Sequence, residues 1–188
     1  MKVVPHNECV CDGCMVKYYN LGLIEEGTGA YNEVMEILKN RKTKVIAGFP
    51  AVGKSVVTKN SHTVVLDSDS SKFSWISEGV RHPEFPNNYI QHIKANIGKA
   101  DYILVSSHDV VRKALEENNI EYTLVYPSIE LKDEYLERYR NRGNDEKFIS
   151  FISRNWDSFI EDIEAETFPT LNKLNSGEFL ADVLEGNY

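Results

Sequence analysis

Short runs of apolar residues alternate along this chain with longer segments in which apolar residues recur at helical spacing. The short runs at 45–47, 63–66, 102–107 and 122–126 predict strands. Helical spacing predicts helices over 31–41, 87–97, 109–118 and much of 131–165. Continuous apolar strands separated by helices are typical of a parallel sheet that is covered on both faces. We therefore expect an α/β three-layer sandwich with a parallel sheet of four to five strands.

The two ends of the chain depart from this alternation. Residues 1–42 hold a cluster of cysteines and one predicted helix, so we treat them as an N-terminal segment before a main domain at 43–188. The apolar pattern gives no evident fifth strand after residue 154, and the last twenty residues predict a loop and a short helix.

Polar or turn-forming residues lie where the predicted strands end. They are Gly48, Asp67, Ser106 and Pro127. The ligand of an open parallel sheet binds at the carboxyl ends of the strands. We therefore expect these four residues to converge although they are far apart in the sequence.

The charge balance limits the partners of the chain. The 188 residues include 21 Lys and Arg against 29 Asp and Glu, a net charge of −8. Sequence-independent binding to nucleic acid needs many contacts between Lys or Arg and phosphate, so this balance disfavours it without excluding a local basic groove. No apolar run approaches 18 residues, and the N-terminus lacks the apolar core of a signal peptide. We expect a cytoplasmic protein with no membrane partner, and nothing in the sequence indicates an oligomeric state.

Three cysteines, Cys9, Cys11 and Cys14, lie close to His6. An odd number of cysteines in a reducing compartment argues against a disulfide framework. The four side chains are of the types that bind zinc, but they are crowded into nine residues and no second Cys/His pair follows. We favour a reduced, partly buried segment over a structural zinc site.

The segment 48-GFPAVGKS-55 fits the pattern G-x-x-x-x-G-K-[ST] at every fixed position. Between a strand and a helix, such a loop curls its backbone N–H groups around phosphate oxygens. Lys54 would reach the β- and γ-phosphates, and Ser55 would bind Mg²⁺. We predict that the loop binds ATP with Mg²⁺ through Gly48, Ala51, Val52, Gly53, Lys54, Ser55 and Val56. The alternative is a glycine-containing turn without a ligand.

Two carboxylates follow the second predicted strand. Asp67 and Asp69 are two residues apart, so on an extended segment they point to the same side. We interpret Asp67 as a ligand of Mg²⁺ or its waters, and Asp69 as the base that accepts a proton from an attacking hydroxyl. The alternative is a polar turn, in which Asp and Ser are common.

Arginines cluster after the fourth predicted strand, in 124-LVYPSIELKDEYLERYRNRG-143. Arg138 and Arg142 are four residues apart, and Arg154 lies off the apolar stripe of the next predicted helix. The planar fork of donors on arginine suits a phosphoryl group in transfer. We predict a short mobile lid over 138–154 that brings at least one of these arginines to ATP. The alternative is solvated ion pairs, such as Glu134 with Arg138.

With these blocks, residues 43–165 resemble the small P-loop kinases, namely adenylate, shikimate and gluconate kinases and their phage-encoded relatives. The matching segments are 48-GFPAVGKS-55, 67-DSD-69 and the strand, proline and arginine helix at 124–142. The resemblance implies a P-loop NTPase fold and phosphoryl transfer from ATP, in the bacterial host cytoplasm if the chain is phage-encoded. It also puts 79-GVRHPEFPNNYIQHI-93 where such kinases hold the phosphate acceptor. Asp69 and Arg81 thereby become candidates for substrate binding, with a surface arginine as the alternative for Arg81.

The Asp-Gly-Phe-Pro-Arg signature of adenylate kinases is missing. The resemblance therefore implies phosphoryl transfer, but not AMP as the acceptor. Our first hypothesis is an ATP-dependent phosphotransferase that acts on a small metabolite, a nucleoside or nucleotide. A second is a polynucleotide or modified-base DNA kinase, in which Trp75, Tyr89 and Lys94 would line a groove. A third is a non-catalytic ATP-binding regulatory protein.

Overall fold

The computed structural model describes residues 11–57 and 63–185. These residues form two compact units, which are described separately. The first unit comprises the described residues up to Val45 and those of Ser55–Leu104, and the second comprises Ile46–Lys54 and the described residues from Val105 onward. None of the helices in 11–57 and 63–185 is long and apolar enough to cross a membrane.

Five strands are hydrogen-bonded into one sheet in the order β2-β5-β1-β6-β7. They are β1 (Lys44–Gly48), β2 (Val65–Asp67), β5 (Tyr102–Ser106), β6 (Tyr122–Pro127) and β7 (Thr170–Leu174). The strands run parallel in the pairs β2 with β5 and β6 with β7. Most residues of β1, β5 and β6 are buried, because strands inside a parallel sheet are covered on both faces. The expected α/β fold with a parallel sheet and flanking helices is confirmed.

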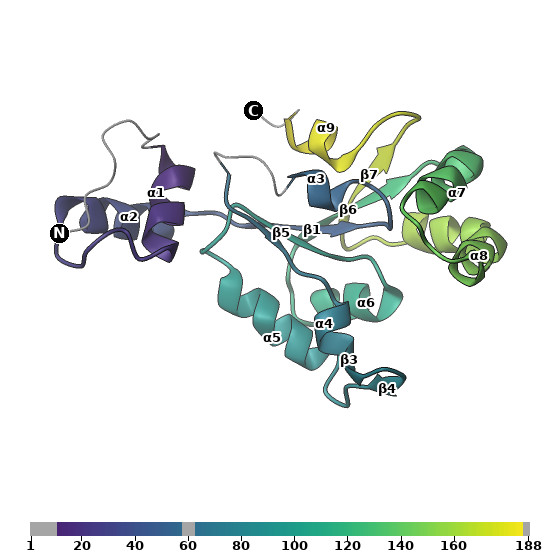
Figure 1. The fold of residues 1–188 in the computed structure, drawn as a ribbon, viewed down its shortest axis with the longest axis horizontal. Helices are drawn as coiled ribbons and strands as arrows, with labels where there is room; N and C mark the ends of the chain where they lie inside the picture. Colours follow the sequence, from purple (N-terminus) through teal and green to yellow (C-terminus); the bar gives the residue numbers. More distant parts are fainter. Residues whose placement is uncertain (1–10, 58–62, 186–188) are drawn as a thin grey trace. The chain divides into compact units, whose positions relative to one another are not determined.

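Helices form in each segment where the sequence predicted one, and α1 and α4 are additional (Figure 1). They are α1 (Asp12–Asn20), α2 (Gly29–Asn40), α3 (Lys54–Val57), α4 (Ser71–Ser74), α5 (Asn87–Asn96), α6 (Asp109–Glu117), the 3₁₀ turn η1 (Ile129–Leu131), α7 (Lys132–Asn141), α8 (Glu146–Glu164) and α9 (Leu180–Glu185). A two-stranded hairpin, β3 (Trp75–Ser77) and β4 (Val80–Arg81), follows α4. The helix α2 begins earlier than predicted because the hydroxyl of Thr28 accepts the N–H of Tyr31 at 3.2 Å and caps it.

The strand β7 is a correction to the sequence analysis, which predicted only a loop and a short helix in this region. It pairs with β6 from Thr123 opposite Thr170 to Pro127 opposite Leu174. Only Leu174 of β7 is buried, because the strand lies at the edge of the sheet. A strand with one buried residue carries little apolar pattern, which explains why the sequence does not reveal it.

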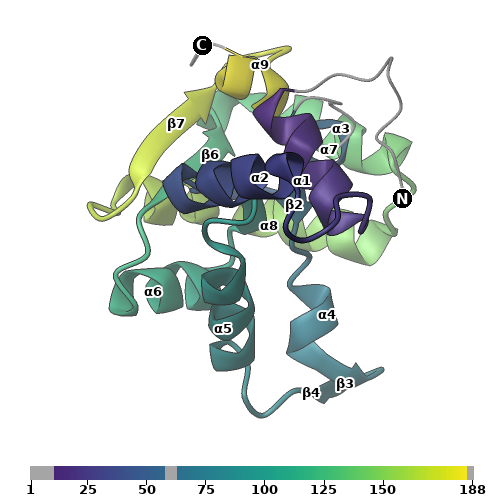
Figure 2. The same ribbon diagram turned by 90° about the vertical axis from the view of Figure 1, so that its left-hand side faces the viewer.

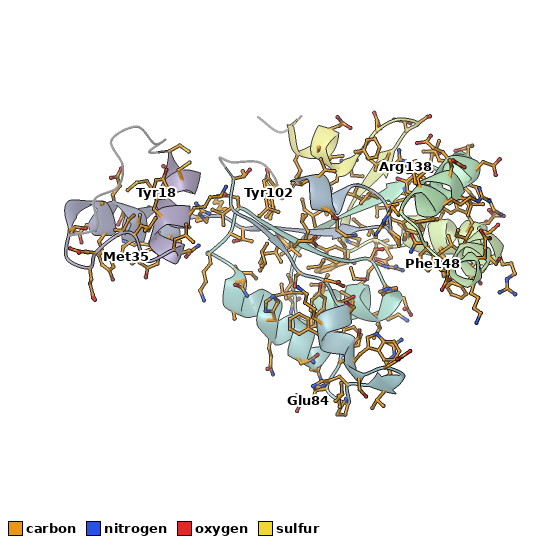
Figure 3. All side chains as sticks on the ribbon, viewed as in Figure 1. Tyr18, Met35, Glu84, Tyr102, Arg138 and Phe148 are labelled. Carbon is orange, nitrogen blue, oxygen red and sulfur yellow. The ribbon has the colours of Figure 1, made fainter. Side chains whose placement is uncertain are left out.

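In the first unit, α1 and α2 lie side by side (Figures 1 and 2). They enclose Met15, Val16, Ile24 and Val34, against which Tyr18 and Met35 pack (Figure 3). The sequence pattern does not predict α1. Cys11, which precedes α1 as its N-cap, is exposed, and Cys14 within α1 is buried.

The zinc alternative falls partly outside the described residues, where His6 and Cys9 lie. The described residues contain no group of three or more side chains that could hold a metal ion.

In the second unit, aromatic side chains of α7 and α8 pack on the start of the loop that follows β1. The ring of Trp156 lies 5.6 Å from that of Phe49 and 5.5 Å from that of Tyr135. Phe148 meets Tyr139 edge-on at 5.3 Å (Figure 3). The two helices are separate, since α7 ends before Gly143, which has a φ of 78°, and Asp145 caps α8. This packing holds α7 against the loop.

Candidate functional site

The loop between β1 and α3 is held by its carbonyl groups. Lys54 Nζ donates to the carbonyl oxygen of Gly48 at 2.5 Å, and the Val52 N–H donates to that of Phe49 at 3.3 Å. The other three bonds come from distant residues: Tyr139 Oη to Pro50 O (3.2 Å), Arg138 Nη1 to Ala51 O (3.3 Å) and the Leu180 N–H to Val52 O (2.8 Å). All five carbonyls from Gly48 to Val52 therefore accept a hydrogen bond.

The N–H groups of the same loop are used differently. Within the described residues, those of Ala51 and Gly53 donate no hydrogen bond, although both residues are half-buried. Both also have positive φ, 66° for Ala51 and 96° for Gly53. A positive φ costs an alanine roughly 1–2 kcal/mol, so such a conformation is found where the surrounding structure enforces it. Backbone N–H groups exposed by such turns form concave sites for anions.

The absence of a side chain at Gly48 leaves room for the side chain of Lys54. A Cβ at position 48 would lie 3.2 Å from both Cδ and Nζ of Lys54 and 3.0 Å from Cγ2 of Val52. A side chain at position 48 would crowd the folded-back Lys54, whereas glycine lets the lysine hold its ammonium group beside the Gly48 carbonyl.

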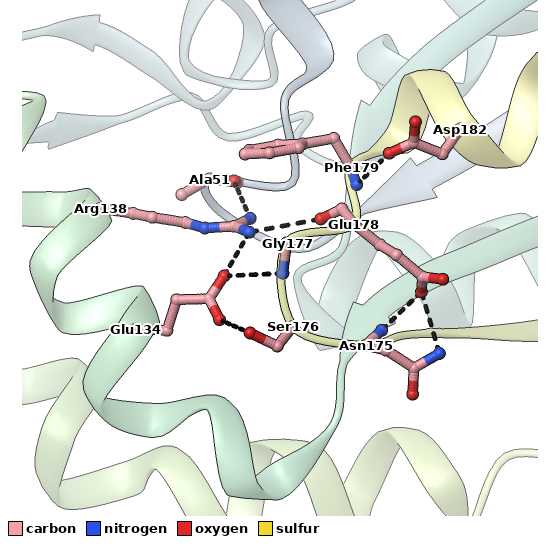
Figure 4. Close-up of polar contacts among 9 residues, drawn as sticks. All are labelled: Ala51, Glu134, Arg138, Asn175, Ser176, Gly177, Glu178, Phe179 and Asp182. Carbon is pink, nitrogen blue, oxygen red and sulfur yellow. Dashed lines mark hydrogen bonds and ion pairs between the residues drawn. The ribbon is translucent and has the colours of Figure 1, made fainter.

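A cluster around Arg138 joins the loop to the segment after β7 (Figure 4). The Arg138 side chain is only 14% exposed. Its guanidinium donates to Glu134 at 2.6 Å and to the carbonyl of Glu178 at 3.3 Å, in addition to that of Ala51. It also lies over the rings of Phe179 (4.1 Å) and Tyr135 (4.5 Å). The i,i+4 pair of Glu134 and Arg138 that the sequence offered as the alternative is present, with loop contacts added to it.

Glu134 is itself fixed by the segment after β7. Ser176 Oγ donates to it at 2.7 Å, and the Gly177 N–H donates at 3.4 Å (Figure 4). The hydrogen bond from Ser176 holds the pKa of Glu134 below its usual value, with help from Gly177 and Arg138 and against the effect of burial. The carboxylate therefore stays ionised and keeps Arg138 in position.

Sequence reasoning missed the residues that cover the loop from a distance. Phe179 contacts the position of Gly53, where an added Cβ would lie 3.2 Å from its ring. Tyr139 donates to Pro50 from 89 residues further along the chain, and burial raises its pKa, so it stays protonated as a donor. The nearby Tyr135 hydroxyl, whose pKa burial raises to about 12, is buried without a partner among the described residues. No local pattern signals such long-range contacts.

The other two predicted arginines are placed differently. Arg142 is the exposed residue that ends α7, and Arg154 is exposed on α8, where its Nε donates to the Ser150 carbonyl at 3.3 Å. Of the three arginines, Arg138 is thus the one with hydrogen bonds to the loop among the described residues, and the lid over 138–154 stays a prediction.

The predicted carboxylates lie in the first unit, at the end of β2. Asp67 is the last residue of that strand, and Asp69 accepts the N–H of Ser71, the first residue of α4, at 2.9 Å. Between them, the Ser68 N–H donates to the Leu104 carbonyl at 2.9 Å, and the Ser68 carbonyl accepts the hydroxyl of Tyr89 at 2.5 Å. Both carboxylates are exposed, while the backbone that carries them is fixed.

Ser55 and Val56 follow Lys54 in α3, and both are exposed. Arg81 lies on the hairpin, where its guanidinium stacks on the ring of Trp75 at 4.1 Å. Tyr89 is fully buried, so the expectation that it lines a nucleic-acid groove with Trp75 and Lys94 is wrong.

An open depression of about 560 Å³ lies elsewhere in the first unit. Its walls include Asp12, Glu33, Glu36 and Asp101 beside Arg41 and Lys42. Four carboxylates repel a phosphate, so we do not assign the predicted anion site to it.

No protein-family model and no curated protein matches this chain.

Proposed function

We propose that this chain is a P-loop NTPase domain with ATP-dependent phosphotransferase activity, whose acceptor is a nucleoside or nucleotide. The observation that carries the proposal is the division of polar groups in the 48–54 loop. Its carbonyls from Gly48 to Val52 accept hydrogen bonds, while the N–H groups of Ala51 and Gly53 donate none among the described residues. A loop with this polarity offers donors to phosphate oxygens.

Lys54 supplies the positive charge for the β- and γ-phosphates. Its ammonium group already lies over the loop, at 2.5 Å from the Gly48 carbonyl. A bound phosphate would exchange this neutral acceptor for an anionic one, which adds the Coulomb attraction between the ammonium group and the phosphate. Movement of the Lys54 ammonium group toward the phosphates is therefore energetically favourable when ATP binds.

Ser55 and Asp67 carry the hard oxygen atoms that suit Mg²⁺. Magnesium takes few protein ligands in such sites because it keeps waters and phosphate oxygens, so one hydroxyl and one carboxylate suffice. Bound there, the ion would neutralise charge on the phosphates. Asp69 is the proposed base for the acceptor hydroxyl, and its bond from the Ser71 N–H fixes the carboxylate.

One observation favours a non-catalytic ATP-binding protein as a second candidate. Arg138 is engaged by Glu134, Ala51 and Glu178, so it supports the loop rather than standing ready for a phosphoryl group. Catalysis would then depend on Arg142 or Arg154, which are exposed.

The test is turnover by Lys54→Ala. ADP release from ATP with Mg²⁺ is measured with a panel of nucleosides, nucleoside monophosphates and 5′-hydroxyl oligonucleotides. Removing one preorganised donor that faces the charge developing in the transition state typically lowers kcat by about 10²–10³-fold. We expect Lys54→Ala to lower kcat by about that factor. The matched control is Lys39→Ala, which removes an exposed lysine whose ion pair with Glu36 lies on α2.

Each outcome decides between the hypotheses. Wild-type turnover in Lys54→Ala would contradict the role of the loop. ATP binding by the wild type without turnover of any acceptor would favour the non-catalytic protein. Turnover of the oligonucleotides alone would favour the polynucleotide kinase.

A further inference from the structure

The β3–β4 hairpin presents apolar side chains to solvent. All five residues of the two strands are exposed, including Trp75 (41%), Ile76 (64%) and Val80 (50%). Figures 1 and 2 show the hairpin beyond α4, within the first unit. An isolated two-stranded hairpin is marginally stable at best. Because Trp75 is exposed on such a hairpin, its ring contributes little to a hydrophobic core.

Arg81 forms the second half of this surface. Trp75 is paired with Arg81 across the strands, and the guanidinium carbon lies 4.1 Å from the indole centroid. Arg81 forms no ion pair within residues 11–57 and 63–185, although the exposed Glu78 and Glu84 lie near it in the sequence. The result is a flat aromatic ring with an unneutralised flat cation on it.

The hairpin is anchored to the segment that carries the two aspartates. The His82 N–H donates to the Ser74 carbonyl at 3.0 Å, and Asn88 Nδ2 donates to the Phe73 carbonyl at 2.9 Å. Phe73 packs on Tyr89, whose hydroxyl bonds to the carbonyl of Ser68. These hydrogen bonds and this ring contact connect the hairpin to Ser68, between the two aspartates.

We propose that Trp75 and Arg81 form a stacking platform for the nucleobase of the phosphate acceptor. Every nucleobase has a π face that stacks on aromatic rings or on the guanidinium plane of arginine, and the arginine charge favours the phosphate attached to it. The base comes from a free nucleotide or from the end of a single strand. The acceptor role rests on the proposed function, whereas binding of the base does not. The competing explanation is that the pair only stabilises the hairpin.

The platform is tested by tryptophan fluorescence without ATP. The chain has two tryptophans, and Trp156 is fully buried, so a quenching ligand reports on Trp75. The probes are thymidine 5′-monophosphate, an eight-residue oligothymidylate and ribose 5-phosphate, which lacks a base. We expect the first, the second or both to quench the wild type and neither to quench Trp75→Phe, with no effect of ribose 5-phosphate. The stronger of the two thymidine probes identifies the source of the base.

Affinity variants separate stacking from charge. One stacked base is worth roughly a 5- to 150-fold change in Kd, so Trp75→Ala should weaken binding of the better probe, measured by calorimetry, by about that factor. Arg81→Lys keeps the charge but loses the plane, and it should also weaken binding. Ile76→Ala removes a more exposed apolar side chain from the same hairpin and should leave Kd unchanged.

The platform fails if no thymidine probe quenches Trp75, or if Trp75→Ala binds like the wild type. Equal binding of ribose 5-phosphate and thymidine monophosphate would also overturn it. The Lys54→Ala variant keeps the two proposals apart, because it should lose ATP turnover and retain thymidine-dependent quenching. Normal turnover with retained quenching would contradict the role of the 48–54 loop and leave the platform in place.

Discussion

In the proposed mechanism, the two oxygens of the Asp69 carboxylate would act separately. One oxygen accepts the N–H of Ser71, the first residue of α4, at 2.9 Å. The other oxygen remains available to accept a proton. An asparagine at this position would still offer a carbonyl oxygen to Ser71, but it would have no basic group. The substitution therefore separates the structural function from the chemical one.

We predict that Asp69→Asn lowers kcat by about 10²–10⁴-fold, the usual contribution of a general base. The melting temperature should change little, because the hydrogen bond to Ser71 survives. Asp67→Asn should instead raise the Mg²⁺ concentration needed for half-maximal turnover. Both are measured by steady-state kinetics over a series of Mg²⁺ concentrations. Wild-type kinetics in both variants would remove these carboxylates from the reaction.

At the scale of elements, the edge strand β7 matters most for the loop. It leads into Ser176, Glu178 and Phe179, which contact Glu134, Arg138 and the position of Gly53. The next N–H, that of Leu180, holds the Val52 carbonyl. The cover of the loop is therefore built by a strand that the sequence does not reveal.

The difference between predicted and missed elements has a physical cause. Strands β1, β5 and β6 are covered on both faces, so burial imposes the continuous apolar runs that predict them. The edge strand β7 carries Asn172 and Lys173, and the exposed hairpin β3–β4 buries neither face, so neither has a local signal. The candidate site divides in the same way. The loop, the Asp pair and the Glu134–Arg138 pair are local in sequence, whereas Tyr139 and Phe179 reach the loop through tertiary packing.

The three arginines of α7 and α8 give a graded test of the lid. Arg138→Ala removes the donor to the carbonyls of Ala51 and Glu178, and it leaves the Glu134 carboxylate with only the bonds from Ser176 and Gly177. A hydrogen bond to a charged group contributes about 1.5–3 kcal/mol to the free energy of unfolding. We therefore expect the melting temperature of Arg138→Ala to fall by roughly 3–10 °C. Arg142→Ala and Arg154→Ala remove exposed side chains and should melt like the wild type.

Turnover then distinguishes support from catalysis. An arginine that reaches the phosphoryl group is worth orders of magnitude in kcat, so Arg142→Ala or Arg154→Ala should lose activity without losing stability. Arg138→Lys serves as the control for position 138, because it keeps the charge and loses the planar fork. Normal kcat in both exposed variants would contradict the lid, and the non-catalytic protein would gain support.

At the scale of the whole molecule, each compact unit contains one tryptophan. Trp75 lies on the exposed hairpin of the first unit, and Trp156 is buried in the second, against Phe49 at the start of the loop. Fluorescence of Trp156 therefore reports on the packing of the unit that holds the 48–54 loop, independently of the hairpin.

We predict that ATP with Mg²⁺ raises the melting temperature reported by Trp156. A ligand at a hundred times its Kd stabilises the folded state by about 2.7 kcal/mol, which for a chain of this length corresponds to roughly 5–10 °C. Lys54→Ala should lose most of this shift, because the ammonium group no longer meets the phosphates. Trp75→Phe should keep it, since the proposed platform takes the base of the acceptor and not that of ATP. A shift of equal size in Lys54→Ala would mean that ATP binds elsewhere. If saturating ATP did not shift the melting temperature of the wild type, the proposal that the 48–54 loop binds ATP would be contradicted.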